Sequence, residues 1–167
     1  MVMMLLAIIL LIAVIVLALL YWGLRVVVRR WLGDDMQKQA ILLVVLLVVQ
    51  FILGMLANLF QNIPKVKPYL VFHEVGPIAL HTANATVILF LAIIFRILSA
   101  KKKRMEVPAG IGGTGVGVAY LCGILFVNGG QNNLYSFVMS LGFVMAIVAF
   151  SYAAFSPAKV VKRSRRS

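Results

Sequence analysis

The sequence predicts an all-α integral membrane protein with five transmembrane helices, in which an N-terminal anchor helix precedes a four-helix bundle. Three observations support this fold class. Of the 167 residues, 63% are hydrophobic, and the mean hydropathy is +1.08. Five apolar stretches approach the roughly 20 residues that a helix needs to cross a bilayer. The basic residues are gathered beside alternate stretches, as they are in membrane proteins of fixed orientation.

The first apolar stretch, from Val2 to about Leu24, predicts a retained anchor helix. A cleaved signal peptide carries its positive charge before the apolar core, whereas here Arg25, Arg29 and Arg30 follow it. The chain is therefore expected to divide into an anchor, a bundle and a basic tail, at residues 1–28, 39–155 and 156–167.

The four bundle helices are predicted from hydropathy together with residues that favour helix boundaries. Acidic side chains at Asp34 and Asp35 precede the second apolar stretch and indicate a helix start. Pro77 suits the first turn of the third helix, because proline lacks the N–H that would be unpaired there. The expected spans are Gln39–Phe60, Pro77–Leu98, Gly110–Val127 and Asn133–Phe155.

The positions of the basic residues predict the orientation in the membrane. Fourteen of the 16 Lys and Arg lie after the first span, at the end of the third span or in the loop that follows it, or after the fifth span, whereas only Lys65 and Lys67 follow the second. By the positive-inside rule, the N-terminus lies outside the plasma membrane and the C-terminus in the cytoplasm. The same clustering accounts for the net charge of +12, so nucleic acid is not an expected partner.

One face of the second span carries small and polar residues on an otherwise apolar helix. Such a face is expected to contact protein rather than lipid. With the predicted topology it lies in the outer half of the membrane, so any functional site is expected at that end. The residues of this face are Gln50, Gly54, Ala57, Asn58 and Gln61.

His81 is the strongest single candidate for a functional residue. It lies about one turn inside the third helix, with Asn84 and Ala85 on the same face. Ionisable residues within membrane helices commonly mark functional sites. The alternative is that His81 only bonds a neighbouring carbonyl or an interfacial water, an explanation favoured for His73 in the preceding loop. A metal site made of both histidines and Glu74 is not favoured, because two of the three ligands are adjacent.

Spans two and three resemble spans four and five in a weak internal repeat. When the two pairs are aligned, Gly54 corresponds to Gly123, and His81 corresponds to Met139. Both pairs cross the membrane outward and return, so a parallel repeat is compatible with the predicted topology.

These residues carry a resemblance to a known family. The pattern of the first pair resembles one hairpin of a haem A synthase half, a family in which each of two four-helix bundles holds a haem between histidines of different helices. The chain departs from the family at Met139, where the family has a histidine, and its second span has no histidine. Haem A synthase activity itself is therefore not expected. The resembling elements are Gln50-x-x-Leu53-Gly54, Pro64, His81-x-x-x-Ala85 and Arg96.

The resemblance implies a b-type haem with His81 and Met139 as its axial ligands. Histidine–methionine ligation raises the reduction potential of a haem. For Met139 the alternative is that it fills an apolar gap, as methionines often do. Two glycines are expected to let a flat ring approach the backbone, and two lysines to pair with propionates; these are Gly54, Gly123, Lys65 and Lys67.

A glycine-rich run opens the fourth predicted span. Gly110 to Gly115 matches G-x-G-x-x-G, but no strand precedes it, so a dinucleotide site is not expected. The spacing instead predicts small-residue packing faces against a neighbouring helix. The two faces are Gly113-x-x-x-Gly117 and Gly115-x-x-x-Ala119-x-x-x-Gly123.

The sequence leaves three functions open. The first is a subunit of a respiratory or other redox complex that transfers electrons through a haem, with lipid and other membrane subunits as partners. The second is a structural accessory subunit without a cofactor. The third is a small transporter, which is disfavoured because the expected midplane lacks charged residues and broken helices. A quinone or a lipid is an alternative occupant of the outer region.

Overall fold

A computed structural model describes residues 35–63 and 76–156, which form four α-helices and no strand. Each helix is long and apolar enough to cross a membrane, which confirms four of the predicted spans. The anchor predicted at 1–28, the tail from 157 onward and the loop that contains Lys65, Lys67, His73 and Glu74 lie outside the described residues. The helices are α2 (Met36–Phe60), α3 (Pro77–Ser99), α4 (Lys103–Asn128) and α5 (Asn133–Phe155).

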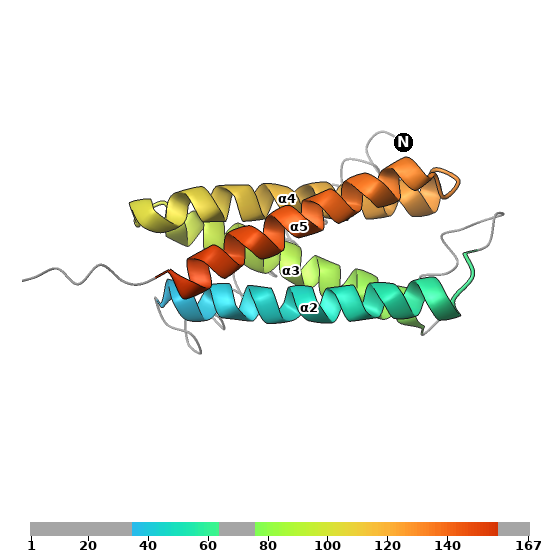
Figure 1. Ribbon diagram of the computed structural model, residues 1–167, viewed down its shortest axis with the longest axis horizontal. Coiled ribbons are helices and arrows are strands. Elements are labelled where there is room, and N and C mark those ends of the chain that lie inside the picture. The colour runs from blue at the N-terminus through green and yellow to red at the C-terminus, as the bar shows by residue number, and fades with distance from the viewer. Residues whose placement is uncertain (1–34, 64–75, 157–167) are drawn as a thin grey trace, which may run out of the picture.

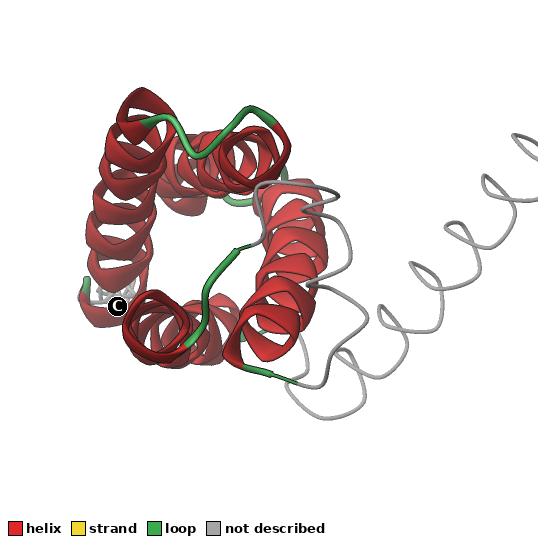
Figure 2. Ribbon diagram, turned by 90° about the vertical axis from the view of Figure 1, so that its right-hand side faces the viewer, coloured by secondary structure: helices red, strands yellow, loops and turns green. Residues whose placement is uncertain are grey.

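The helices form an up-down-up-down bundle in which each packs on two neighbours. Helix α2 contacts α3 and α5, and α4 contacts the same two helices from the opposite corner. Seen end-on, the four helices stand at the corners of a square (Figure 2). Helices α4 and α5 make the most extensive contact, and α5 runs obliquely from α4 at one end of the bundle toward the start of α2 at the other (Figure 1).

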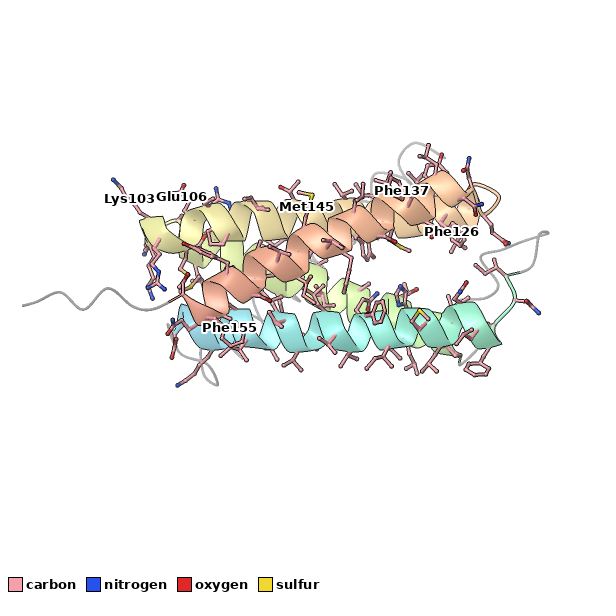
Figure 3. All side chains as sticks on the ribbon, in the orientation of Figure 1. Lys103, Glu106, Phe126, Phe137, Met145 and Phe155 are labelled. Carbon is pink, nitrogen blue, oxygen red and sulfur yellow. The ribbon has the colours of Figure 1, made fainter. Side chains whose placement is uncertain are left out.

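The two ends of this bundle differ in composition. We call one end the basic end; it holds the start of α2, the α3–α4 turn with Lys101–Arg104, and the end of α5. We call the other the open end; it holds the end of α2, the start of α3 and the α4–α5 turn. In Figure 3, Lys103 and Glu106 lie at the same end as Phe155, and Phe126 and Phe137 lie at the other.

Helix α2 begins at Met36, three residues before the expected Gln39. Asp35 is its N-cap, as the acidic pair predicted, and its side chain accepts hydrogen bonds from the amides of Gln37 at 3.0 Å and Lys38 at 3.4 Å. Its slight burial raises the pKa of the Asp35 carboxyl, but these hydrogen bonds and the Lys38 charge outweigh that effect and lower the pKa overall. The cap therefore favours the ionised carboxylate.

The prediction that α4 begins at Gly110 was wrong, because the helix begins at Lys103 and runs through Pro108. Glycine and proline disfavour a helix interior, which suggested a later start. In apolar surroundings, however, the backbone groups have no water to bond, so the helical conformation is strongly favoured. Because Pro108 lies near the helix start, it removes only the hydrogen bond to the carbonyl of Arg104.

The basic end is closely packed. The rings of Phe95 and Phe150 meet edge to face with centroids 5.6 Å apart, and both side chains are almost fully buried. Nearby, the side chains of Gln37 and Arg104 both donate to the carbonyl of Ser156, with a distance of 2.8 Å from Gln37 Nε2. These bonds satisfy a carbonyl just beyond the end of α5 that has no partner within the helix.

The two hairpins, α2–α3 and α4–α5, bury corresponding residues, which supports the predicted repeat. We aligned the first helices on Gly54 and Gly123, and the second helices on His81 and Met139. In each alignment, four buried residues of one helix fall on four buried residues of its counterpart. The matched buried sets are Met36, Ala40, Leu43 and Leu47 with Met105, Ala109, Gly112 and Val116, and Ile88, Leu91, Ala92 and Phe95 with Ala146, Ala149, Phe150 and Ala153.

Candidate functional site

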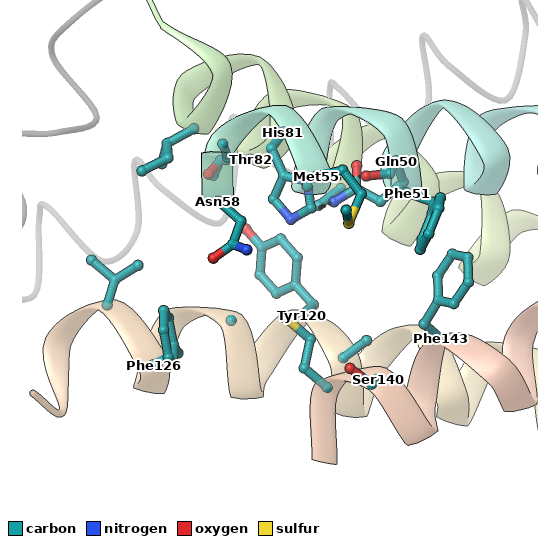
Figure 4. A pocket seen from close by; sticks show the side chains of 18 of the residues that line it. Gln50, Phe51, Met55, Asn58, His81, Thr82, Tyr120, Phe126, Ser140 and Phe143 are labelled. Carbon is teal, nitrogen blue, oxygen red and sulfur yellow. Dashed lines mark hydrogen bonds between the residues drawn. The ribbon is translucent and has the colours of Figure 1, made fainter. Parts of the chain in front are cut away.

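A cavity of about 610 Å³ lies among all four helices in the half of the bundle toward the open end (Figure 4). Its volume falls within the roughly 300–1,000 Å³ that is typical of cofactor and small-molecule sites. The polar face predicted on the second span lines it with all five of its residues. Four of the predicted site residues also line it, whereas Lys65 and Lys67 lie outside the described residues; the four are His81, Met139, Gly54 and Gly123.

Helices α2 and α5 diverge toward the open end (Figure 1), and side chains of both line the cavity. Phe51 and Met55 of α2 and Val144 of α5 line the cavity and are also exposed on the bundle surface. The rings of Phe51 and Phe143 stack across this gap with centroids 5.9 Å apart. In a helix bundle that crosses a membrane, these exposed side chains face lipid.

The start of α3 brings His81 to the cavity wall. Pro77 occupies the first turn, and the side-chain oxygen of Gln61 accepts a hydrogen bond from the Ile78 amide at 2.9 Å, which caps the helix. One turn later, the His81 ring lies against the backbone of α2 at Gly54. A Cβ added at Gly54 would lie 3.0 Å from His81 Cε1, so a larger residue at this position would push the imidazole from its place.

Gly123 and Met139 repeat this arrangement in the other hairpin. A Cβ added at Gly123 would lie 3.6 Å from Met139 Sδ. The repeat aligns Gly54 with Gly123 and His81 with Met139. The structure therefore shows the same glycine contact in both hairpins. In the structure, Gly54 and Gly123 line the cavity and adjoin the side chains of His81 and Met139. That these glycines let a flat cofactor approach the backbone stays a prediction.

Both ring nitrogens of His81 face Gln50. Nδ1 lies 3.2 Å from the Gln50 backbone oxygen, and Nε2 lies 3.0 Å from the Gln50 side-chain nitrogen. Asn84 Nδ2 donates to Gln50 Oε1 at 2.8 Å and to the Leu46 carbonyl at 3.1 Å. The sequence analysis gave a bond to a neighbouring carbonyl as the alternative role of His81. The structure contains such a contact, with the Gln50 carbonyl.

Tyr120 is a polar group of the cavity that the sequence analysis did not identify. Its hydroxyl lies 3.3 Å from Thr86 Oγ1, which itself donates to the Thr82 carbonyl at 2.9 Å. Because that donation uses the threonine proton, Tyr120 is the donor to Thr86. Tyr120 lies three residues before Gly123, which places it on the cavity face of α4. This spacing could have identified Tyr120 from the sequence.

The residues around the cavity fit the expected haem on chemical grounds. A metal-binding histidine commonly donates its other ring N–H to a carbonyl, and Nδ1 of His81 has such a partner in Gln50. Met139 offers a thioether to the same cavity from another helix. Ligation through Nε2 requires the Gln50 amide to turn away from the ring. Within residues 35–63 and 76–156, no group of three or more His, Cys, Asp or Glu could hold a bare metal ion.

The chain matches no protein-family model, no curated protein and no solved structure. The resemblance of residues Gln50 to Arg96 to a haem A synthase hairpin therefore stays a prediction. The function is argued from the geometry of the cavity.

Proposed function

We propose that this protein is a small subunit of a redox complex in the plasma membrane, and that its cavity holds one b-type haem between His81 and Met139. The observation that carries the proposal is that these two side chains, from different helices of different hairpins, line a single cavity of about 610 Å³. A haem held by these ligand types supplies one-electron transfer. Partner subunits of the same complex would donate and accept the electron.

The orientation predicted from the basic residues places the cavity near the outer face of the membrane. Lys101–Arg104 lie at the basic end, which by the positive-inside rule faces the cytoplasm. The cavity lies toward the opposite end. The N-terminus is then outside and the C-terminus inside, and electrons would exchange at the outer side.

The chain's own residues have defined tasks in this proposal. The Gln50 carbonyl orients the imidazole of His81 through Nδ1, while Gly123 adjoins the side chain of Met139. Most of the lining is apolar, and a low dielectric around a haem affects its reduction potential. Pairing of Lys65 and Lys67 with the propionates stays a prediction.

Absorbance spectroscopy of the detergent-solubilised protein tests the proposal. We expect a Soret band and, after reduction with dithionite, sharp α and β bands. His81→Ala is expected to abolish the bands, and Met139→Leu to lower the reduction potential. Met145→Leu is the matched control, because Met145 lies on the same helix but is exposed and outside the cavity. A featureless spectrum in protein made with ample haem would overturn the assignment.

The contacts of His81 also favour a second candidate, a structural accessory subunit without a cofactor. Both ring nitrogens already have partners on α2, so His81 could serve only to join the two helices. His81→Ala would then lower the thermal stability of a colourless protein. Co-purification in a mild detergent tests the subunit assignment shared by both candidates, and a stable monomer without partners would contradict it.

A quinone is the other occupant compatible with the cavity, because its lining includes apolar side chains of α2 and α5 that are also exposed on the bundle surface, where lipid-soluble molecules would lie. Organic extraction followed by chromatography separates the alternatives. A stoichiometric quinone in a colourless protein would replace the haem proposal.

A further inference from the structure

We propose that Gln50 is the positioning residue of His81: it fixes the tautomer of the imidazole and occupies the nitrogen that a haem would take. The inference rests on the proposed function only for the identity of the ligand. The hold of Gln50 on His81 is a property of the protein itself. A chain of hydrogen bonds runs from the Leu46 carbonyl through Asn84 and Gln50 to the ring.

The orientation of both carboxamides follows from one backbone carbonyl. The Leu46 oxygen can only accept, so the atom of Asn84 that lies 3.1 Å away must be the nitrogen Nδ2. The same nitrogen lies 2.8 Å from the side chain of Gln50, which must therefore present its oxygen Oε1. Consequently the Gln50 nitrogen is the atom that points at His81.

The tautomer of His81 follows from this orientation. An amide nitrogen only donates, so Nε2 of His81, 3.0 Å away, accepts with its lone pair. Nδ1 lies 3.2 Å from the Gln50 carbonyl, which only accepts, so Nδ1 carries the proton. The ring is thus the neutral Nδ1–H tautomer, and both nitrogens are held by a single residue.

This arrangement prepares His81 for ligation while it covers the ligating atom. The Nδ1–H bond to a carbonyl is the contact that commonly orients a metal-binding histidine. To bind, Nε2 exchanges one neutral hydrogen bond for a bond to the ligand's metal, and no proton is transferred. A ligand that interacts with Nε2 more weakly than the Gln50 amide is excluded, so Gln50 contributes selectivity.

Nuclear magnetic resonance of the imidazole nitrogens tests the hold of Gln50 without any ligand. The chain has two histidines, so a His73→Ala background labelled with ¹⁵N-histidine reports His81 alone. We expect a protonated Nδ1 and an unprotonated, hydrogen-bonded Nε2. In Gln50→Met, which cannot donate, the Nε2 resonance should move downfield. A protonated Nε2, or a spectrum that Gln50→Met leaves unchanged, would overturn the inference.

Titration with haem tests the effect on binding with two substitutions of opposite sign. Gln50→Met removes the competing donor and should bind haem about 3- to 10-fold more tightly, the range expected for one neutral hydrogen bond. Gln50→Glu keeps an acceptor for Asn84, but its carboxylate accepts a hydrogen bond from Nε2, so the ligating nitrogen becomes protonated and the affinity should fall below that of the wild type. If Gln50 acted only as a packing residue, both substitutions would shift the affinity in the same direction.

Asn128→Leu is the control for these substitutions. It removes a carboxamide whose exposed bond goes to Ile124 of its own helix, outside the cavity, and leaves Gln50, Asn84 and His81 in place, so we expect unchanged haem affinity and an unchanged Nε2 resonance. If neither the wild type nor Gln50→Met binds haem, the proposed function fails while the resonance data still decide the role of Gln50. If haem binds and the two Gln50 variants match Asn128→Leu, the positioning role is wrong and the proposed function stands.

Discussion

The two hairpins of the bundle have the same topology but are joined in different ways. In α4–α5 the backbones touch: a Cβ added at Gly115 would lie 2.6 Å from the Gly142 carbonyl oxygen, and one added at Gly142 would lie 3.0 Å from the Ala119 nitrogen. In α2–α3 the contact is made by side chains, through the hydrogen bonds of Gln50 with His81 and Asn84. Small residues and interhelical hydrogen bonds are the two common means of helix association in membranes.

This difference shows how one bundle can combine a fixed part with an adaptable part. A backbone contact has no alternative arrangement, so α4–α5 cannot change without separating. A carboxamide can rotate and exchange its partner, so the α2–α3 contact can be remade around a ligand. His81, the candidate ligand whose contacts can be exchanged, belongs to the adaptable hairpin α2–α3. Met139 belongs to the fixed hairpin α4–α5.

The largest effect is expected when the backbone contact of α4–α5 is broken. Gly115→Leu places a side chain against the Gly142 carbonyl, which cannot move aside, and should destabilise the bundle by about 3 kcal/mol or more, at the upper end of overpacking effects. Thermal unfolding followed by circular dichroism in detergent measures the loss. Gly113→Leu is the control, because a Cβ there meets no atom within 4 Å, and it should unfold near the wild-type temperature. Equal losses in the two variants would contradict the close contact.

A smaller effect is expected when the polar contact of α2–α3 is broken. Asn84→Leu removes both donations of Nδ2 and leaves the Leu46 carbonyl and Gln50 Oε1 without that donor. The expected loss is about 1–3 kcal/mol, the cost of unsatisfied groups that are partly buried. The same unfolding assay applies. Asn128→Leu removes only an exposed bond to Ile124 within its own helix and should have little effect; a loss as large as that of Asn84→Leu would contradict the assignment.

Much of this comparison could be predicted from the sequence, because it depends on spacing along single helices. Small and polar residues at helical intervals placed Gln50, Gly54 and Asn58 on one face, and all three line the cavity. The matching of His81 to Met139 anticipated two residues that line the same cavity. The register of one helix against another could not be predicted, since the contact of Gln50 with His81 joins residues 31 positions apart.

The packing of α4 shows why the remaining features were out of reach. Two small-residue faces were predicted on this helix, and their sequence patterns are equivalent. The face of Gly115 packs on α5, whereas a Cβ at Gly113 or Gly117 meets no atom within 4 Å. Which face is used depends on where α5 lies, and that is decided by the whole bundle rather than by the motif.

The smallest expected effect is also the most direct test of the difference between the hairpins, because it makes the same change at matched positions. Gly54→Ala pushes a methyl group to within 3.0 Å of His81 Cε1, so the ring must shift and its bonds to Gln50 must lengthen. Gly123→Ala brings a methyl group to an ordinary 3.6 Å from the flexible Met139 side chain. Alanine favours the helix over glycine by about 1 kcal/mol, so Gly123→Ala should be neutral or stabilising, and Gly54→Ala should lose that gain. An equal change in unfolding temperature for the two substitutions would mean that His81 is held against α2 no more rigidly than Met139 is held against α4. The packing of His81 would then give no support to the difference between the two hairpins.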